Sequence, residues 1–455
     1  MSAAAATPLR LEAIRDALEG FIPIGIATLA PDGTPNVTYI SQVHYVDPDH
    51  VALTYQFFNK TRANLLASPR ALLQLIDPVT AETFRIAVTY QRTETSGPVF
   101  ESMRAKLAGI ASHTGMAGVF RLAGADICRV ESIEAVPGDV LPPRERPRLL
   151  PVLRRTAACL GREPDLAAAL DALMAALDRE FGIAHAAVFL LAADGRTLYA
   201  VASRGYAESG IGAEIAVGDG VIGMAAQERI AVRINHMTTD VNYARGVGAR
   251  MAPQGLDQAI PLPGLDRPGS QLAVPIEDGQ GLLGVLFVES PEDMRFSYDH
   301  EDALAVLAAQ LAVTVRRAAS GPRAARKAAP APVPAAPAAL PPIDLRYYRA
   351  NDSVFIGGDY LIKGVAGSIF WILTGAWCEE GRCEFTNREL RLRPELRLPM
   401  HAENLEARLI LLERRLAEKD CGIAIEKTGR GRFRLRVDRP LRRHEMQAEP
   451  AAREG

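Results

Sequence analysis

Two cations flank a threonine in Lys60-Thr61-Arg62, at the predicted start of a helix. The preceding residue, Asn59, is a good helix N-cap, so all three would lie in the first helical turn. The helix dipole disfavours cations at this end unless an anion occupies the free backbone N–H groups. These residue types and their spacing predict an anion site. A basic turn that faces solvent is the alternative.

The residues around this turn resemble the pyridoxamine-phosphate-oxidase-like FMN-binding split barrels. The resemblance rests on the strand that ends near Gln56, on the basic turn, and on the segment from Asn64 to Ala71 (NLLASPRA). It implies FMN as cofactor, with the basic turn on the phosphate and the strand along the ring: Lys60, Thr61 and Arg62 for the phosphate, and Thr54 and Gln56 for the ring. Haem, another flavin and no cofactor are the alternatives, because relatives with this fold differ in what they hold.

A second group of cations lies near the C-terminus, on a predicted helix and the hairpin after it. Apolar residues recur there at helical spacing, which predicts one stripe that faces a core: Leu405, Leu409, Leu412 and Leu416. Arg408 and Arg415 are then expected to face outward. A helix followed by an arginine-rich hairpin is how a winged helix presents a groove-reading helix and a phosphate-touching wing. The residues expected to contact duplex DNA are Asn404, Arg408, Arg415, Lys427, Arg430 and Arg432.

Residues 360–437 resemble the winged-helix output domains of two-component response regulators of the OmpR type. The segments that carry the resemblance are Phe385 to Leu390, Asn404 to Leu416 as recognition helix, and Thr428 to Leu435 as wing. Leu411 and Glu413 stand where that family often has arginines, and Arg432 replaces a wing glycine. The resemblance is therefore closer for the fold than for base reading, and a solvated basic face on an ordinary α+β domain is the alternative.

The central part of the chain resembles a GAF domain. A predicted helix and paired strands precede Gly218 to Gly223 (GDGVIG), and the last strand ends in Gly284 to Ser290 (GVLFVES). This resemblance implies a small-molecule effector and a homodimer formed through the terminal helices. Long irregular loops in compact domains are usually functional or disordered. The loop from Asp240 to Gly269 therefore supplies the expected ligand-binding residues Asn242, Tyr243 and Arg245. A GAF domain kept only for dimerisation is the alternative.

Composition limits the class of protein. A chain of 455 residues predicts about three domains, and 48% hydrophobic residues are enough for sizeable cores. The net charge of −2 argues against nucleic-acid binding by the whole chain, yet lysine and arginine outnumber acidic residues from Arg382 to Arg443. Neither a signal peptide nor an apolar run of about 20 residues is recognisable, so a cytoplasmic protein without a membrane partner is expected. The five cysteines are scattered, and the three near the C-terminus (Cys378, Cys383 and Cys421) lack zinc spacing, so buried structural cysteines and no metal are expected there.

The expected fold class is multidomain α+β, with a split β-barrel, a GAF α/β sandwich and a winged helix-turn-helix. An alternating Ala/Pro segment cannot bury a core and is read as a linker. The expected ranges are a disordered start (1–8), the FMN-binding barrel (9–140), the GAF domain (149–318), the linker (319–342), the winged helix (343–440) and a polar tail (441–455).

This order of domains favours a cytosolic ligand- or redox-sensing transcriptional regulator that binds DNA through its C-terminal winged helix. A flavin-dependent oxidoreductase with a regulatory GAF domain is one alternative, and a ligand-sensing scaffold without DNA binding is another. No paired carboxylates or nucleophile–base spacing is recognisable in the barrel, so no catalytic residue is named.

Overall fold

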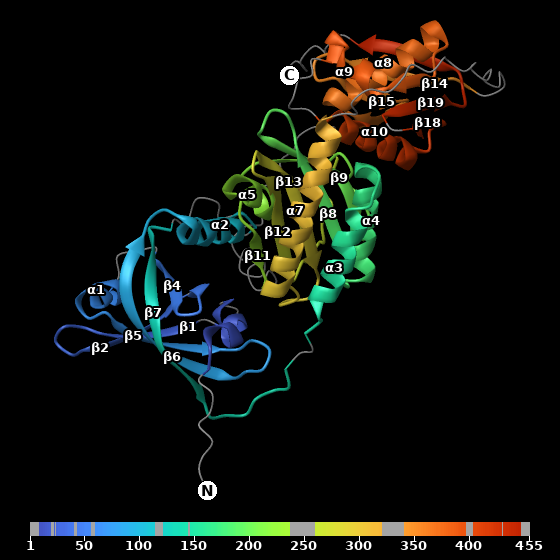
Figure 1. The fold of residues 1–455 in the computed structure, drawn as a ribbon. Helices are drawn as coiled ribbons and strands as arrows, with labels where there is room; N and C mark the ends of the chain where they lie inside the picture. Colours follow the sequence, from blue (N-terminus) through green and yellow to red (C-terminus); the bar gives the residue numbers. More distant parts are fainter. Residues whose placement is uncertain are drawn as a thin grey trace.

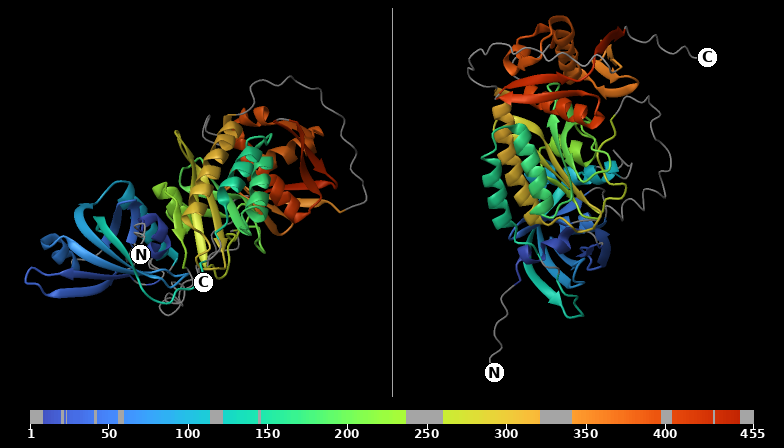
Figure 2. Two further views of the ribbon diagram at one scale, coloured as in Figure 1. Left: turned by 60° about the horizontal axis from the view of Figure 1, so that its bottom comes forward. Right: turned by 90° about the vertical axis from the view of Figure 1, so that its right-hand side faces the viewer.

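The computed structural model describes residues 9–19, 22, 24–40, 43–55, 60–113, 122–143, 146–236, 260–320, 341–396, 404–429 and 431–446. These residues form three units in a row (Figure 1). The central unit contacts both of the others, as the two further views also show (Figure 2).

The N-terminal unit is built on one antiparallel seven-stranded sheet in the order β2-β1-β5-β6-β7-β4-β3. Buried and exposed residues alternate along β1 and β5, because one face of the sheet packs on the core and the other does not. The strands are β1 (Ile24–Leu29), β2 (Pro35–Ile40), β3 (Val43–Asp47), β4 (His50–Tyr55), β5 (Arg70–Ile76), β6 (Thr83–Glu94) and β7 (Gly124–Val136). The helices are η1 (Leu11–Glu19), α1 (Lys60–Ala67) and α2 (Pro98–His113).

Two contacts join the N-terminal unit to the central one. Helix α2 packs on the central unit, and its Ala105 belongs to that unit's hydrophobic core. Arg15 of η1 lies between two rings, with its guanidinium carbon 4.0 Å from the ring centre of Tyr45 and 3.7 Å from that of Tyr298. Arg233 approaches the same Tyr298 ring at 4.0 Å. Because Arg15 comes from the N-terminal unit and Tyr298 from the central one, this cation–π contact joins the two units.

The central unit is an antiparallel six-stranded sheet in the order β10-β9-β8-β13-β12-β11. Helices α3, α4 and α7 cover one face, and α5 covers the other together with α2 (Figure 1). The strands are β8 (His185–Leu191), β9 (Thr197–Arg204), β10 (Glu214–Ala216), β11 (Val232–Ile234), β12 (Ser270–Asp278) and β13 (Gly281–Ser290). The helices are α3 (Leu149–Leu160), α4 (Leu166–Arg179), α5 (Gly220–Glu228) and α7 (Tyr298–Ser320).

Strand β9 contributes to two different cores, because successive side chains of a strand point to opposite faces. Tyr199 and Val201 join the core shared with α3, α4, α7 and the C-terminal unit. Leu198 and Ala200 join the core beneath α5. All four side chains are buried.

The C-terminal unit has two sheets and a layer of helices. A four-stranded sheet has the order β16-β15-β14-β20, and a three-stranded sheet has the order β17-β19-β18. The strands are β14 (Ile343–Tyr348), β15 (Ser353–Ile356), β16 (Asp359–Ile362), β17 (Glu384–Thr386), β18 (Ile423–Gly429), β19 (Arg432–Val437) and β20 (Leu441–Met446). The helices are α8 (Gly364–Glu380), α9 (Asn387–Arg391), η2 (Pro394–Leu396) and α10 (Leu405–Lys419).

Two expectations differ from the structure here. Leu441–Met446 was expected in a polar tail, but it is strand β20, which pairs in parallel with β14. Its residues are mostly polar, and four of the six are exposed, so they lack the apolar alternation by which a strand is recognised. Of the three C-terminal cysteines expected to be buried, only Cys383 is; Cys421 is half-buried and Cys378 is exposed. The expected Ala/Pro linker lies almost wholly outside the described residues, as does the expected disordered start.

Among the helices that the structure describes, each is too short or too polar to span a bilayer.

Candidate functional site

The basic turn lies at the N-terminus of α1, as expected. Lys60 is the first residue of the helix and is exposed, and the first turn contains no acidic residue. Thr61 points inward and is only 7% exposed, and its hydroxyl oxygen accepts a hydrogen bond from Asn36 Nδ2 at 3.0 Å. Of these two residues, Lys60 is therefore the one that can meet a ligand in solution.

Arg62 belongs to a buried polar network between α1, β6 and β7. Its Nη2 donates to Thr93 Oγ1 at 3.2 Å, and its Nε lies 3.6 Å from Asp126 Oδ2. Thr93 in turn donates to Asp126 Oδ1 at 2.6 Å. Burial raises the pKa of Asp126, while the Thr93 hydrogen bond and the Arg62 charge act in the opposite direction. Asp126 was not predicted from the sequence, although a carboxylate between the apolar residues Ala125 and Ile127 was the available signal.

Some of the residues at the basic turn are suited to the phosphate of a flavin, and others are engaged in contacts within the protein. Backbone N–H groups at the α1 N-terminus and the Lys60 ammonium are suited to a phosphate. Arg62 would have to exchange part of its contact with Asp126, and Thr61 would have to turn from Asn36. Thr54 is half-buried at the end of β4, where it pairs with Ala125, and Gln56 lies outside the described residues.

Helix α10 has two stripes with different partners. The apolar stripe faces the core of the C-terminal unit as predicted, with exposures of 0%, 7%, 0% and 1% for Leu405, Leu409, Leu412 and Leu416. The opposite stripe was expected to face solvent. It lies instead on the central unit, so that the expectation of outward-facing arginines is wrong for this arrangement of the domains.

The contacts of this second stripe run along the whole helix. The Arg408 guanidinium carbon lies 3.7 Å from the ring centre of Tyr199, and Arg408 is 8% exposed. Arg414 donates to the backbone oxygen of Val201 at 2.6 Å and to Asp171 Oδ1 at 2.5 Å.

The ends of the stripe also touch the central unit. Glu418 accepts a hydrogen bond from the Ser209 hydroxyl. A Cβ added at Gly212, whose φ is +86°, would lie 3.4 Å from Leu411 Cδ1. Glycine at this position lets the central unit's backbone approach α10 closely. Arg415 is turned toward its own unit, where Nε donates to the Leu361 oxygen at 3.1 Å and Nη1 to Glu418 at 2.7 Å.

The last turns of α7 end against the same surface. The last four backbone carbonyls of a helix have no intrahelical partner, and the Ala319 oxygen is one of them. Asn404 Nδ2 donates to the Val315 oxygen at 3.2 Å, and Arg391 Nη2 donates to the Ala319 oxygen at 2.8 Å. Asn404 also caps α10, because its Oδ1 accepts from the Ala407 N–H at 3.2 Å. This one side chain therefore joins the start of α10 to the end of α7.

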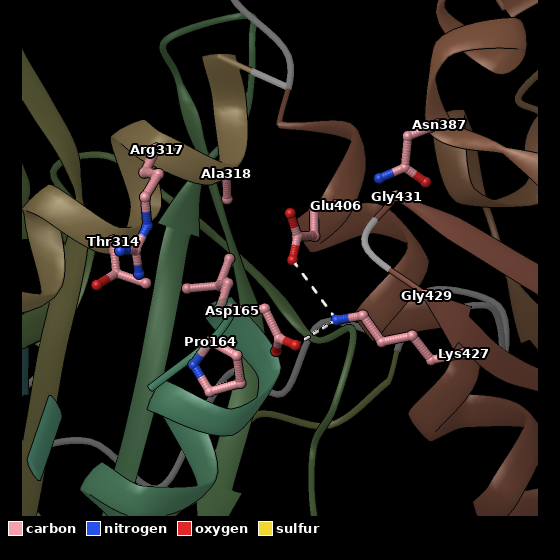
Figure 3. Close-up of a pocket in the computed structure, with 11 residues that line it drawn as sticks. Pro164, Asp165, Thr314, Arg317, Ala318, Asn387, Glu406, Lys427, Gly429 and Gly431 are labelled. Carbon is pink, nitrogen blue, oxygen red and sulfur yellow. Dashed lines mark hydrogen bonds and ion pairs between the residues drawn. The ribbon is translucent and has the colours of Figure 1, made fainter. Parts of the chain in front are cut away.

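The hairpin β18–β19 closes the seam between the two units. Lys427 Nζ lies 2.5 Å from Asp165 Oδ2 and 4.0 Å from Glu406 Oε1 (Figure 3). Asp165 caps α4 as well, and the Lys427 and backbone hydrogen bonds lower its pKa although burial acts the other way. Arg432 begins β19 and is half-buried, and Arg430 lies outside the described residues.

A pocket of about 300 Å³ adjoins this ion pair. Its walls come from the central unit on one side and the C-terminal unit on the other, and the Asn387 amide and the Arg317 guanidinium lie on opposite walls (Figure 3). The seam is thus open to solvent where Lys427 meets Asp165.

A buried carboxylate lies at the end of β13. Glu289 is 1% exposed and accepts hydrogen bonds from the Leu265 N–H at 2.8 Å and from Gln271 Nε2 at 3.0 Å. Burial raises the pKa of Glu289, and burial together with the Glu289 charge raises the pKa of Tyr206. The sequence analysis missed this site, although an acidic residue in an apolar strand marked it. The expected ligand residues Asn242, Tyr243 and Arg245 lie outside the described residues.

Comparisons with known proteins identify two of the three units. The family model for pyridoxamine 5'-phosphate oxidase matches residues 11–127, and the model for the GAF domain matches residues 165–315. None of the curated proteins matches the chain. The chain therefore contains a pyridoxamine 5'-phosphate oxidase-like domain followed by a GAF domain, which confirms these two predictions. Both matched ranges end before the C-terminal unit, for which the winged helix stays a prediction.

Solved structures resemble single domains of the chain. The GAF domain of phosphoenolpyruvate-protein phosphotransferase from Acinetobacter is 22% identical, with a TM-score of 0.32 over 39% of this chain and 99% of that one. An FMN-binding protein from Syntrophomonas wolfei subsp. wolfei is 16% identical, with a TM-score of 0.24 over 28% of this chain and 88% of that one. Free methionine-R-sulfoxide reductase from Neisseria meningitidis, in complex with its substrate, is 21% identical, with a TM-score of 0.28 over 36% and 85%.

Proposed function

We propose that the chain is a ligand-responsive transcriptional regulator whose C-terminal unit is a winged helix that binds duplex DNA. In this proposal α10 is the helix that enters the major groove, and the hairpin β18–β19 is the wing that touches phosphate. Effector binding by the two N-terminal domains sets the activity of the C-terminal unit.

The order and pairing of elements in the C-terminal unit carry this proposal. Strand β17 pairs with β19, and β18 pairs with β19, so the three strands form one small sheet. In the chain, α9 and α10 lie between β17 and the hairpin β18–β19, and the hairpin contacts α10. Thr386 caps α9 by accepting from the Glu389 N–H at 3.2 Å, which fixes the turn into the helical pair. The helix and hairpin carry four of the cations expected to meet DNA, namely Arg408, Arg415, Lys427 and Arg432. Arg408 and Lys427 are held against the central unit, and Arg415 against its own unit.

The sensory role is assigned to the GAF domain and the oxidase-like domain. A small-molecule effector of the GAF domain would be recognised near the buried Glu289, which is the hydrogen-bonded carboxylate of that interior. In the oxidase-like domain the proposed cofactor is FMN, with Lys60 and the α1 N-terminus on its phosphate. A bound flavin would supply redox chemistry, and therefore sensitivity to the redox state of the cell.

We further propose a homodimer formed through the outer face of the GAF helices. Three large apolar side chains are exposed on the packed helices α3 and α7: Leu150 at 75%, Val306 at 49% and Val313 at 60%. A twofold dimer would bring two C-terminal units to two half-sites of a duplex.

Binding to duplex DNA across a salt series tests the DNA-binding role. Arg432→Ala in the full chain is expected to weaken binding to all sequences and to reduce the salt slope by about 1, because one phosphate contact is lost. Arg349→Ala is the matched control, since Arg349 is a 78% exposed arginine that follows β14 and lies outside the helix and hairpin. Equal affinity and equal slope for both variants would refute the wing assignment.

A further inference from the structure

We infer that the GAF domain and duplex DNA compete for the same face of α10 and its hairpin, so that the GAF domain holds the chain off DNA. This inference rests on the proposed DNA-binding function. It adds that the arrangement in the structure is the closed, inhibited one, and that DNA binding requires the C-terminal unit to leave the GAF domain.

The two partners use one surface. On α10 the GAF-facing contacts come from Asn404, Arg408, Leu411 and Glu418, which are spaced by three, four or seven residues and so lie along one side of the helix. The opposite side is committed to the core of the C-terminal unit. A groove-reading helix can contact DNA only through the side that faces away from its own core. In α10 the GAF domain covers this side. A duplex cannot reach it while the GAF domain is docked.

Carboxylates of the GAF domain pair with cations of the C-terminal unit, as the phosphates of DNA would. Asp171 holds Arg414 at 2.5 Å, Asp165 holds Lys427 at 2.5 Å, and Glu214 lies 2.9 Å from Lys363 Nζ. Carboxylate and phosphate oxygens are interchangeable partners for these side chains, so each pair can be exchanged for a DNA contact. The docked state thus uses charge complementarity that DNA can replace.

The ion pairs of the seam are weak enough to be exchanged. The Asp171 side chain is 74% exposed and the Lys427 side chain is 45% exposed, and ion pairs with this exposure are individually worth little. The pocket beside Lys427 lets an incoming phosphate approach that cation before the units separate (Figure 3). The ion pairs of the closed state are therefore exchangeable, and separation of the units also opens the apolar contacts that the two units share.

Strand β9 gives the GAF interior a direct connection to the docked face. Tyr199 and Val201 meet α10 through Arg408 and Arg414. The residues between and before them, Ala200 and Leu198, line the core under α5 on the other side of the sheet. A ligand that moves β9 by binding on that side changes the contacts of α10 as well. Such a ligand shifts the equilibrium only as far as it binds the open and closed states with different affinities.

Three neutralising substitutions on the GAF side test the inference in the full chain. The combined variant Asp165→Asn, Asp171→Asn and Glu214→Gln removes the three cross-domain ion pairs named above without changing a residue expected to contact DNA. Asparagine remains a good cap for α4 at position 165. The control variant Asp178→Asn, Glu180→Gln and Glu277→Gln removes the same charge from the same domain, where the partners are Arg204, Arg155 and Arg229. The control therefore accounts for long-range repulsion of DNA.

Two measurements on these proteins decide the outcome. The cross-domain variant should bind a duplex about tenfold more tightly than the control, since three weak ion pairs add up to an effect of this size. Without DNA, the amides of 405–419 should exchange with solvent faster in the cross-domain variant than in the control.

The possible results separate the inference from the function on which it rests. Equal DNA affinity of the two variants, with binding by the wild-type chain, would overturn the competition and leave the DNA-binding function standing. Faster exchange in the cross-domain variant without DNA binding by any of the three proteins would refute the DNA-binding function, and the inference with it.

Discussion

The guanidinium of Arg408 lies over the ring of Tyr199, 3.7 Å from its centre, and joins the helix proposed to read DNA to strand β9 of the GAF domain. Arg408 is 8% exposed and Tyr199 is 2% exposed, so this contact is inside the seam between the domains. Arg408, which is expected to contact duplex DNA, thus has an aromatic ring as its partner in the closed chain. This contact supports the inference that the GAF domain and duplex DNA bind the same surface of α10.

The apolar stripe of α10 should determine the stability of the C-terminal unit. Leu412→Ala leaves a cavity at a fully buried position, so we expect the free energy of unfolding to fall by about 2–5 kcal/mol. Both tryptophans of the chain, Trp371 and Trp377, are in α8, so fluorescence during urea unfolding reports on this unit. The control Glu413→Ala, at an exposed position of the same helix, should change the midpoint little. A midpoint equally insensitive to both changes would contradict the assigned core.

His300 should make the GAF domain less stable as the pH falls. The ring is 3% exposed, its Nδ1 accepts from the Ser297 N–H at 3.2 Å, and Arg295 Nη1 lies 3.1 Å from its Nε2. Burial and the Arg295 charge lower the pKa of His300 from 6.5 to about 4.

Between pH 6.5 and pH 4 the His300 side chain is therefore protonated in the unfolded chain and neutral in the folded chain. Stability is retained above this window and is lost as the pH falls through it, by up to about 3 kcal/mol at its lower end. Hydrogen exchange of β12 and β13 amides at pH 7.5 and pH 5 measures the loss after correction for intrinsic exchange rates. His300→Gln should flatten the dependence, and an equally steep dependence in that variant would show that another group is responsible.

Lys60 should contribute to flavin uptake if FMN is the cofactor of the oxidase-like domain. We expect Lys60→Ala to weaken FMN binding about tenfold, since a charge-assisted contact to phosphate is lost. Titration followed by flavin fluorescence measures the affinity. The control Arg85→Ala removes an exposed cation from β6 of the same sheet and should bind FMN as the wild-type chain does. A wild-type chain that takes up no FMN would remove this cofactor from the account.

The proposed dimer predicts that a charge on the outer face of α7 separates the subunits. Val313 is 60% exposed on this helix, and Val313→Asp would bury a carboxylate in the interface. Sedimentation equilibrium at micromolar concentration should show a dimer for the wild-type chain and a monomer for the variant. Leu392→Asp changes an equally apolar residue, 73% exposed in the C-terminal unit, and should leave the dimer intact. A variant at position 313 that still sediments as a dimer would place the interface elsewhere.

Local patterns predicted the elements of the chain well, but not the partners of its charged side chains. The leucine stripe of α10 was predictable because helical spacing determines which residues share a face. Arg408 looks the same in sequence whether it meets solvent, DNA or Tyr199, because the choice depends on a strand about 200 residues away. Arg62 is the same case, since its partner Asp126 lies on β7. Strand β20 was missed for a different reason, namely that its stability comes from pairing with β14 and not from an apolar face.

The binding of a mixed-sequence duplex by the wild-type chain, measured between 50 and 200 mM salt, tests the central claim most directly. Each phosphate contact contributes about 0.9 to the log–log slope, so a helix and hairpin with several cations predict a slope of about −3 or steeper. Saturable binding with such a slope is the result that this account predicts. No binding at the lowest salt, by the wild-type chain or by the cross-domain variant freed from its GAF contacts, would contradict it.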